Sequence, residues 1–385
     1  METIKGFKDY SGQEAIKREI IKNILIKNFK KYGFEPAETP ILEFEKFVKG
    51  NNQQDEVISD MFKLKDKGKR SLALRYEFTF QLKRLTKNKK LPYKRYQIGQ
   101  VFRDEPISAN RFRQFTQCDI DIIGSSIKED AEILALVSKI LKELNIQADF
   151  NINNRKLLNE ILQREGIKEK DREQVIREID KLDKLSEKEV KSNLKKFRAE
   201  NLINIFKKQE QFFEQYEAYS EIKELKKYCK YYGINFNFQP SLARGLSYYV
   251  GTIFEIKTKT MKETVCAGGS YLIDGFLSTG ISFGLERLSK LAQVNSKRND
   301  VLVLSVGQDK EAIELSENLR NEDINCFVMF GKISKSLGHA NNKKINYVIF
   351  VGEAEVKKGK FKIKDMDSGK EFLLKIKDII KKIKN

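Results

Sequence analysis

Two strand-like runs joined by a polar link constrain the fold of this chain more than any other feature. Residues 94–103 and 112–123 are rich in Ile, Val, Phe and Thr, and the link DEPISAN contains the turn formers Asp, Pro, Ser and Asn. We therefore predict a long antiparallel hairpin. Side chains of a strand alternate between two faces, so the second run has one apolar and one polar face. The polar face starts with Arg111 and Arg113 and ends with Gln117, Asp119 and Asp121.

The order of charges along that face predicts a groove with an anion site at one end and a cation site at the other. Guanidinium groups are planar, bidentate and always charged, so the arginines around the turn, with Arg103, suit phosphate. The adjacent Glu105 suits the amino group of a base. Carboxylates and an amide further along suit an ammonium group and a polar heterocycle. An exposed hairpin with scattered charges is the alternative interpretation of each end taken alone.

The overall charge indicates a polyanionic partner. The chain has 385 residues, with 74 Lys and Arg against 55 Asp and Glu, a net charge of +19 and 40% hydrophobic residues. This length predicts two or three domains with a sizeable core, and the charge excess favours nucleic acid as a partner. Solubility in a lysine-rich proteome is the alternative explanation of the charge.

The cysteines and the N-terminal residues bear on location. Four scattered cysteines without a CxxC pair argue against a zinc knuckle or a disulfide framework and are typical of a reducing cytosol. The charged N-terminus argues against a signal peptide, and no apolar run is long enough to span a membrane. We therefore expect a cytoplasmic protein without membrane association.

Helical and strand patterns predict a mixed unit over the first part of the chain, interrupted by a helical insertion. Residues 155–230 are heavily charged and contain no Pro, which predicts helices with a solvated face; RNA contact is the alternative role of that charge. Outside the insertion we predict helices over 11–32 and 128–146, a strand passing into a helix near Glu77 within 71–85, strands at 235–238, 250–257 and 264–267, and a strand passing through Gly284 into a helix over 279–292.

Residues beyond the polar linker 295–300 have a pattern of their own. DVLVLSVG, INCFVMFG and NYVIFVG are typical of buried strands, with helical patterns at 309–321 and 332–344 between them. A hairpin that turns at 367–369 and a basic helix follow. This alternation predicts a mostly parallel sheet with an added hairpin.

Two further motifs carry candidate binding residues. PSLARGLSYYVGTIFEI contains Arg244, Tyr248 and Tyr249, which suit a pocket; a basic loop before a strand is the alternative. GISFGLERL puts Gly284 at a strand-to-helix turn and Arg287 in the first helical turn. A helix N-terminus already favours anions, so we predict a phosphate site there; an exposed arginine is the alternative.

The sequence contains neither of the two common nucleotide-binding loops. GxxxxGK[ST] and GxGxxG are absent, so a nucleotide has to be held by arginines on an antiparallel sheet. His339 is the only histidine and lies in the C-terminal pattern, far in sequence from the motifs above. We therefore exclude histidine acid–base catalysis in the main unit.

Together these motifs resemble class II aminoacyl-tRNA synthetases, and among them histidyl-tRNA synthetases. ETPILEF resembles motif 1 of the class, FRDEPISANRFRQFTQCDIDIIG resembles motif 2 and GISFGLERL resembles motif 3. LRYEFT (74–79), QCDIDIIG (117–124) and LARGLSYY (242–249) resemble elements specific to the histidine enzymes, and residues 299–385 resemble their anticodon-binding domain. The resemblance covers nearly the whole chain and is weakest over the helical insertion.

The resemblance implies an α+β fold: a class II catalytic domain built on an antiparallel sheet, with a helical insertion and a C-terminal α/β anticodon-binding domain. The implied domains are residues 1–154 and 233–294 (catalytic), 155–232 (insertion) and 299–385 (anticodon-binding). The implied reaction is ATP-dependent ligation of L-histidine to tRNA(His) through a histidyl-adenylate, releasing AMP and pyrophosphate. Mg2+ would accompany ATP, and the protein would be a homodimer.

The resemblance also assigns roles to single residues. Arg244 and Arg103 would be catalytic, and no metal site within the protein is implied. ATP would be held by Arg103, Glu105, Arg111, Arg113 and Arg287. Histidine would be held by Glu77, Phe78, Thr79, Arg103, Gln117, Asp121, Arg244, Tyr248, Tyr249 and Tyr271.

The chain departs from the family pattern in its pocket motifs. Ser247 stands where the family has Asp, Ser270 where it has Arg, two extra residues precede Asp274, and Phe78 replaces a smaller residue. Three alternatives are a regulatory paralogue of histidine biosynthesis without charging activity, a synthetase for threonine, proline or glycine, and a nucleic-acid-binding module without chemistry. The C-terminal tail argues against the first, the QCDID pattern against the second and the ordered charges against the third.

Overall fold

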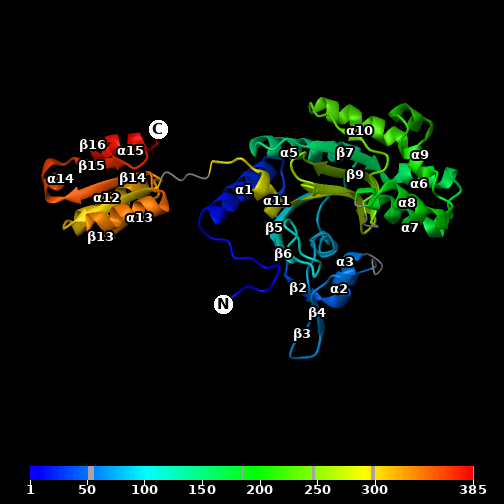
Figure 1. Ribbon diagram of the computed structural model, residues 1–385, viewed down its shortest axis with the longest axis horizontal. Helices are drawn as coiled ribbons and strands as arrows, with labels where there is room; N and C mark the ends of the chain where they lie inside the picture. The colour runs from blue at the N-terminus through cyan, green and yellow to red at the C-terminus, as the bar shows by residue number, and fades with distance from the viewer. Residues whose placement is uncertain (51–55, 184, 245–247, 296–299, 385) are drawn as a thin grey trace. The chain divides into compact units, whose positions relative to one another are not determined.

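The structure, a computed structural model, describes residues 1–50, 56–183, 185–244, 248–295 and 300–384. The chain divides into two compact units, Met1–Val294 and Asn295–Asn385. The first is a mixed unit around an antiparallel-rich sheet and the second is an α/β unit, which confirms the predicted fold class (Figure 1). Within the described ranges, no helix is long and apolar enough to cross a membrane.

An eight-stranded sheet forms the centre of the first unit. Its order is β1-β5-β6-β11-β10-β9-β7-β8, and neighbouring strands are antiparallel except for the β1–β5 and β7–β8 pairs at the two edges. The strands are β1 (Glu35–Pro36), β5 (Tyr93–Phe102), β6 (Gln114–Ile123), β7 (Asp149–Asn154), β8 (Asn237–Phe238), β9 (Tyr249–Lys257), β10 (Cys266–Ile273) and β11 (Phe276–Gly284).

Strands β5 and β6 form the predicted hairpin and pair antiparallel over their whole lengths. The apolar side chains of β6 (Cys118, Ile120 and Ile122) are fully buried in the core shared with helices α1 (Gly12–Lys31) and α5 (Ile127–Glu143). Figure 1 shows both helices on the same side of the sheet. Because side chains alternate, the polar row of β6 faces the opposite side.

The helices over the apolar face lie close to their predicted ranges. Helix α5 starts with a capping box, in which the Ser126 backbone N–H donates to Glu129 Oε2 at 2.7 Å. Helices α10 (Tyr219–Tyr231) and α1 pack on α5, and α11 (Leu285–Leu291) follows β11 directly. The predicted helices over 11–32 and 128–146 are therefore confirmed.

A small three-stranded sheet and short helices lie on the other side of the large sheet (Figure 1). The prediction that a helix starts near Glu77 was wrong, because residues 75–81 are irregular and the helix starts at Leu82. Side chains at both ends of this irregular stretch bind residues 39–43, which holds it off a helical path. The elements are β2 (Leu42–Phe44), β3 (Lys63–Lys65), β4 (Ser71–Leu74), α2 (Glu45–Lys49), α3 (Glu56–Ser59) and α4 (Leu82–Leu85).

The hairpin of β10 and β11 is longer than the sequence predicted. A strand was expected only over 264–267, but β10 continues to Ile273, so the two extra residues before Asp274 extend it. Asp274 and Gly275 then make the turn, with φ of 47° and 84°. An Asp-Gly pair favours these left-handed conformations in tight hairpins, which is the signal that was missed.

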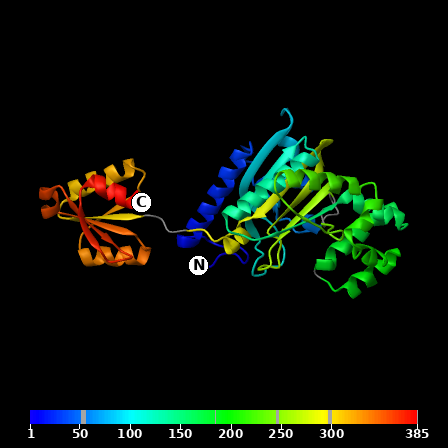
Figure 2. The same ribbon diagram turned by 90° about the horizontal axis from the view of Figure 1, so that it is seen from above.

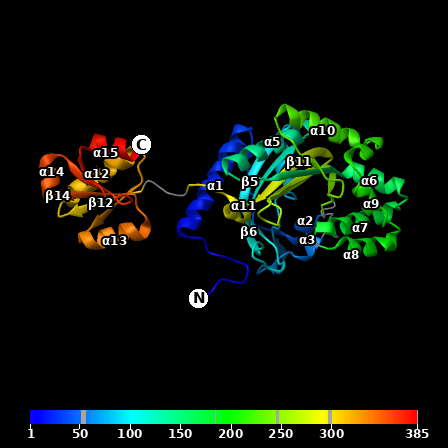
Figure 3. The same ribbon diagram turned by 45° about the horizontal axis from the view of Figure 1, so that its top comes forward.

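The insertion consists of helices that share the core of the first unit. Buried side chains such as Leu157, Ile176 and Leu225 belong to the same hydrophobic cluster as those of β6 and α5. Figure 3 shows α6 to α9 together at one end of the unit. The domain boundaries around this insertion stay a prediction. The helices are α6 (Arg155–Arg164), α7 (Glu169–Asp180), α8 (Glu187–Leu194) and α9 (Leu202–Phe206), with α10 and short 3-10 turns at Lys181–Asp183, Lys195–Phe197 and Glu210–Gln215.

The second unit is a five-stranded sheet with helices on both faces (Figure 2). Its order is β13-β12-β14-β15-β16; the first three strands are parallel and the last two add an antiparallel hairpin, as predicted. Separate apolar clusters form under α12 with α15 and under α13. The elements are β12 (Val301–Val306), α12 (Asp309–Asn321), β13 (Cys326–Phe330), α13 (Ile333–Lys343), β14 (Tyr347–Gly352), α14 (Glu353–Lys358), β15 (Phe361–Asp365), β16 (Glu371–Leu374) and α15 (Ile376–Lys384).

Candidate active site

One end of the polar sheet face is a buried acidic site built around Asp121. Arg95 lies opposite it on β5, with Nη2 at 2.7 Å from Asp121 Oδ2, and Arg95 is fully buried. The hydroxyl of Tyr271 on β10 donates a hydrogen bond to Asp121 Oδ1. Burial raises the pKa of Asp121, while Arg95 and the Tyr271 hydrogen bond oppose that shift. The protein itself therefore balances the negative charge of this carboxylate.

Asp119 and Gln117 continue the row toward the hairpin loop. Gln117 Nε2 donates to Ser282 Oγ on β11 at 2.9 Å, whereas Gln117 Oε1 and Asp119 Oδ1 are buried without a hydrogen-bond partner. Burial raises the pKa of Asp119 to about 7; Arg95 opposes the rise and Asp121 adds to it. Because buried polar atoms are nearly always paired, these two oxygens are acceptors that a ligand donor would satisfy.

A cavity of about 1070 Å³ lies next to this site, since Tyr271, which donates to Asp121, is part of the cavity lining. Its lining includes Glu77, Thr79, Tyr248 and Tyr271 of the predicted histidine-binding set, together with residues of α2. The rings of Tyr248 and Tyr271 meet edge-on with centroids 5.7 Å apart, and Tyr249 stands 4.8 Å from Tyr248. Burial, followed by the charge of Glu77, raises the pKa of Tyr248 well above its usual range, so this carboxylate lies near the tyrosines.

The other end of the polar face is a cluster of arginines. Arg287 Nη1 donates to the carbonyl of Thr264 at 2.7 Å. Burial lowers the pKa of Arg287, and the charges of Arg111 and Arg103 lower it further, so the hairpin and α11 bring these guanidinium groups together. Arg103 also stacks on Phe115, with its guanidinium carbon 5.1 Å from the ring centroid. Gathered like charges of this kind favour a ligand with several anionic oxygens.

Arg113 and Glu105 lie at the base of the hairpin loop. Arg113 Nη2 is 3.0 Å from Asp104 Oδ1, and its backbone N–H donates to the carbonyl of Gly6 at 2.9 Å. Glu105 Oε2 accepts from Arg111 Nη1 at 3.2 Å. Exposed ion pairs of this kind contribute little to stability, so the arginines can exchange them for an anionic ligand.

Arg244 approaches the arginine cluster from the loop before β9. Its Nη1 lies 3.1 Å from Glu255 Oε1, and its φ of 54° is uncommon outside glycine. Glu255 also accepts from Thr264 Oγ1 at 2.6 Å. Since the carbonyl of Thr264 accepts from Arg287, this threonine links the partner of Arg244 to the arginine cluster. Ser247, one of the departures noted in the sequence, lies outside the described residues.

Comparison with known proteins identifies the family. Residues 6–288 match the histidyl-tRNA synthetase family and residues 300–385 match an anticodon binding domain. The chain belongs to the histidyl-tRNA synthetase family. The resemblance stated from the motifs is therefore confirmed.

Individual members of the family align with almost the whole chain. Histidine–tRNA ligase 1 of Bacillus cereus is 32% identical over 98% of this chain and 98% of its own length. Histidine–tRNA ligase of Wolinella succinogenes is 33% identical over 95% of this chain and 94% of its own length. The crystal structure of histidyl-tRNA synthetase from Nostoc sp. PCC 7120 covers 100% of this chain and 98% of that chain, with a TM-score of 0.87 and 26% identity.

Gly280 leaves the space that the carboxylate of Asp121 occupies. The two residues are opposite each other on β11 and β6. A Cβ atom at Gly280 would lie 2.2 Å from Asp121 Oδ1 and 2.9 Å from the carbonyl oxygen of Ile120. Any side chain here would displace the carboxylate, so glycine is required.

Arg95 and Gln97 lie on the same face as the predicted residues but were not predicted from the sequence. In the register of the hairpin, Arg95 is opposite Asp121 and Gln97 is opposite Asp119. The signal was present, since YKRYQIGQVF alternates with the same period as the second strand. Both strands of the hairpin should have been assigned a polar face.

Two departures from the family pattern have structural explanations. Ser270 Oγ donates to both carboxylate oxygens of Asp130 on α5, at 3.1 and 3.0 Å, so its side chain lies on the helix-covered side of the sheet. Phe78 is fully buried, with the guanidinium carbon of Arg75 4.7 Å from its ring centroid. Among the described residues, no group of three or more His, Cys, Asp or Glu side chains is arranged to hold a metal ion.

Proposed function

We propose that this chain ligates L-histidine to tRNA(His) through a histidyl-adenylate formed from histidine and ATP. One observation carries the proposal within this family. A single strand, β6, has the compensated carboxylate of Asp121 near one end and leads into the arginine cluster at the other. Opposite charges in one groove suit a cationic amino acid placed next to a polyanionic nucleotide.

The acidic end is the proposed histidine site. The α-amino group of histidine would bind Glu77 and Thr79, and Gln117 and Asp121 would hold the amino group and the imidazole. The partnerless oxygen of Gln117 and the lining of the neighbouring cavity by Glu77 and Thr79 support this assignment. The remaining proposed contacts are Tyr248, Tyr249, Tyr271, Arg103 and Arg244. Phe78, which is fully buried, would support the stretch 75–81 by packing.

The basic end is the proposed ATP site. Arg103 would contact the α-phosphate and the histidine carboxylate, while Arg113, Arg287 and Arg111 would bind the outer phosphates. Glu105 would accept from the adenine amino group. The mutual effect of the arginines on the pKa of Arg287 supports a shared anion. Mg2+ would enter as part of the ATP substrate, bound to phosphate oxygens.

The first chemical step needs positioning rather than a strong base. The histidine carboxylate is already ionised and attacks the α-phosphorus in line, which expels pyrophosphate. Arg103 and Arg244 stabilise the charge that develops on the phosphate oxygens. The terminal ribose hydroxyl of the tRNA then attacks the carbonyl of the adenylate and loses its proton, and the bond between that carbonyl and the phosphate breaks to release AMP.

The second unit is the proposed contact for the tRNA anticodon. Residues 300–385 match an anticodon binding domain, and the net charge of +19 favours a nucleic acid partner. The insertion stays a further candidate for RNA contact.

Motif 1 is the proposed dimer contact. Its side chains Ile41, Leu42 and Phe44 are 44%, 44% and 55% exposed, which supports a homodimer that covers them. All four cysteines are free, which supports a cytoplasmic location.

ATP–pyrophosphate exchange with each of the twenty amino acids tests the proposed reaction. Histidine alone should support exchange, and the purified protein should then charge tRNA(His). Exchange with another amino acid would overturn the specificity. An absence of exchange with all of them, while histidine still binds, would favour the regulatory paralogue.

A further inference from the structure

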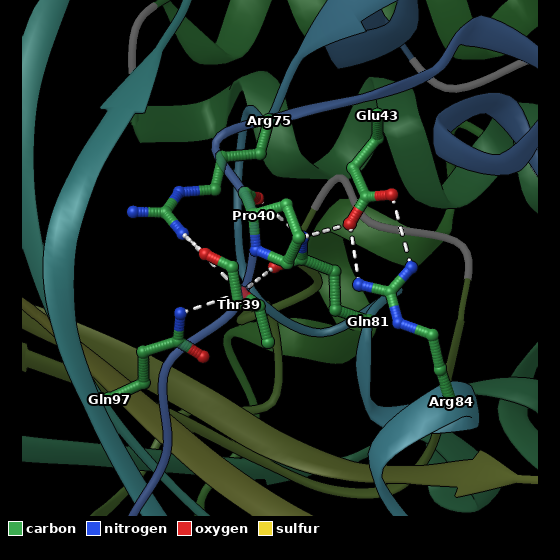
Figure 4. Close-up of polar contacts among 7 residues, drawn as sticks. All are labelled: Thr39, Pro40, Glu43, Arg75, Gln81, Arg84 and Gln97. Carbon is green, nitrogen blue, oxygen red and sulfur yellow. Dashed lines mark hydrogen bonds and ion pairs between the residues drawn. The ribbon is translucent and has the colours of Figure 1, made fainter.

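A network of buried polar side chains joins the stretch 75–81 to residues 39–43 (Figure 4). Arg75 Nη1 donates to the carbonyl of Thr39 at 2.6 Å. Gln81 Nε2 donates to the carbonyl of Pro40 at 2.9 Å and to Glu43 Oε1 at 2.7 Å. Gln81 is fully buried, and Arg75 and Glu43 are only 5% and 8% exposed. Buried polar groups that satisfy one another's hydrogen bonds permit few alternative arrangements. This network therefore fixes the position of the stretch 75–81 relative to residues 39–43. Arg84 and Gln97 complete the set drawn in Figure 4.

The hydroxyl of Thr39 is the centre of the network. It accepts from Gln97 Nε2 at 2.7 Å and from Arg75 Nη1 at 3.3 Å, and it donates to Gln81 Oε1. A threonine hydroxyl has one hydrogen to donate and two lone pairs to accept with, so all its capacity is used. Since Gln97 lies on β5 opposite Asp119, this one hydroxyl connects the pocket floor to both ends of the stretch 75–81.

The network fixes the two ends of an irregular segment. Arg75 precedes and Gln81 follows residues 76–80, which belong to no helix or strand. Arg75 is held a second time, because its Nε donates to the carbonyl of Gln100 on β5 at 2.8 Å. Glu77 and Thr79, the proposed ligands of the histidine amino group, lie between these anchors. Backbone hydrogen bonds also hold Arg75, because its N–H donates to the carbonyl of Ile41 at 2.9 Å and its carbonyl accepts from the N–H of Phe102 at 3.0 Å. The position of Glu77 and Thr79 therefore depends on the contacts of these two anchors, since residues 76–80 form no helix or strand of their own.

Gly99 allows Arg75 to lie against the pocket floor. A Cβ atom at Gly99 would lie 2.7 Å from Arg75 Nη2 and 3.4 Å from Cζ of Phe78. Gly99 is opposite Gln117 in the hairpin. The guanidinium group of Arg75 thus packs between the stretch 75–81 and strand β5, next to Gln117. Its thickness sets the distance between that stretch and the sheet.

We propose that Thr39, Arg75 and Gln81 are positioning residues that set the place of Glu77 and Thr79 relative to the sheet floor. This inference rests on the proposed function, in which Glu77 and Thr79 bind histidine. A loosened segment would have to be ordered on binding, so histidine affinity falls. Arg111, Arg113 and Arg287, proposed for the outer phosphates of ATP, lie in the hairpin loop and on α11, outside the segment. Arg103 follows β5, and its Nε donates to the carbonyl of Tyr76 in the segment at 3.1 Å. We therefore expect histidine affinity to fall much more than ATP affinity.

Thr39→Val is the sharpest variant, because valine has nearly the same shape and makes none of the hydrogen bonds. In ATP–pyrophosphate exchange with the full chain, the KM for histidine should rise about tenfold, the effect of losing a buried hydrogen bond. The KM for ATP should stay within about twofold of the parent value. Thr39→Ser keeps the hydroxyl and should restore the KM for histidine.

Thr86→Val is the matched control. It also removes a hydroxyl, which donates to the carbonyl of Leu82 at 2.8 Å in the same region but outside the network. Both KM values should stay at their parent levels. Gln81→Met tests a second member of the network and should reproduce the selective rise for histidine.

Two sets of outcomes separate this inference from the proposed function on which it rests. If Glu77→Gln raises the KM for histidine but Thr39→Val and Gln81→Met do not, the positioning role is overturned and the role of Glu77 stands. If Glu77→Gln has no effect, the histidine-binding role of the segment fails together with the inference. An equal rise of both KM values in Thr39→Val would show a general structural role and overturn positioning. Where exchange is too slow to measure, the shift of Tm with added histidine provides the same comparison.

Discussion

Arg95 Nη2 lies 2.7 Å from Asp121 Oδ2, and both side chains are buried in the sheet. The pair sits at the point where the acidic site would receive a substrate cation. Tyr271 also donates to the same carboxylate, so Asp121 has an opposite charge and a hydrogen bond within the protein. This arrangement reconciles the burial of Asp121, which raises its pKa, with a carboxylate that is ready to accept from a ligand.

Removing the positive partner should therefore destabilise the protein strongly. Arg95→Met leaves the carboxylate of Asp121 buried without its opposite charge, which costs about 3–5 kcal/mol. Urea unfolding at pH 8 measures the loss. The double variant Arg95→Met with Asp121→Asn should recover a large part of it, because no uncompensated charge remains. Equal losses in the single and double variants would contradict an energetic coupling between the two residues.

The stability of the protein should fall as pH rises through the range in which Asp119 titrates. The pKa of Asp119 is raised from 3.8 to about 7 in the folded state. Between these values the folded protein holds a proton that the unfolded chain has released, so the free energy of unfolding decreases with rising pH. Urea unfolding at pH 5 and pH 8 should show this difference, and Asp119→Asn should reduce it.

Asp130 provides an internal reference for that measurement. Burial raises its pKa to about 6, so it contributes a decrease of the same sign in both the parent and the Asp119→Asn protein. The variant should therefore retain part of the pH dependence. An unchanged pH dependence in Asp119→Asn would contradict the raised pKa of Asp119.

Gly280→Ala should weaken histidine binding selectively. The new methyl group would stand 2.2 Å from Asp121 Oδ1, so the carboxylate must move away from its place in the pocket. We expect the KM for histidine in pyrophosphate exchange to rise by about tenfold or more, with little change for ATP. Gly338→Ala in α13 is the control, because a Cβ atom there meets nothing within 4 Å. A normal KM for histidine would show that Asp121 does not hold the substrate.

Much of the fold was predictable because its local signals agree with its tertiary contacts. The alternation in residues 112–123 gave the face that packs on α1 and α5, and the buried runs of the second unit gave its parallel strands. In each case the periodicity of one short segment matches the side that the core covers.

The remaining features depend on contacts that are distant in sequence. The stretch 75–81 looked helical locally, yet Arg75 and Gln81 bind residues 39–43 and override that preference. The alternation of β5 could have placed Arg95 on a polar face, but its pairing with Asp121 depends on the register of the hairpin. The role of Ser270 likewise depends on Asp130, its partner on α5. Side-chain pairings of this kind are set by register and packing, which no single segment encodes.

Arg244→Ala should abolish most pyrophosphate exchange while histidine still binds. The proposed role of Arg244 is to stabilise charge on the α-phosphate, an interaction that is strongest in the transition state, so kcat falls more than affinity. Losing one such group costs about 100- to 1,000-fold in kcat. Calorimetric titration with histidine alone provides the check on binding. Normal exchange in this variant would remove Arg244 from the catalytic residues.

Ending the chain after Val294 should separate the two reactions of the enzyme. The first unit has its own hydrophobic core, distinct from the two clusters of the second unit, so it should fold without residues 295–385. Adenylate formation uses only the first unit in our proposal, so pyrophosphate exchange should stay within about twofold of the parent rate. Charging of full-length tRNA should fall strongly, because the proposed anticodon contact is lost.

Parent and shortened proteins should be compared at several salt concentrations, since loss of phosphate contacts should also reduce the salt dependence of tRNA binding. Unchanged charging by the shortened protein would remove the assigned role of the second unit.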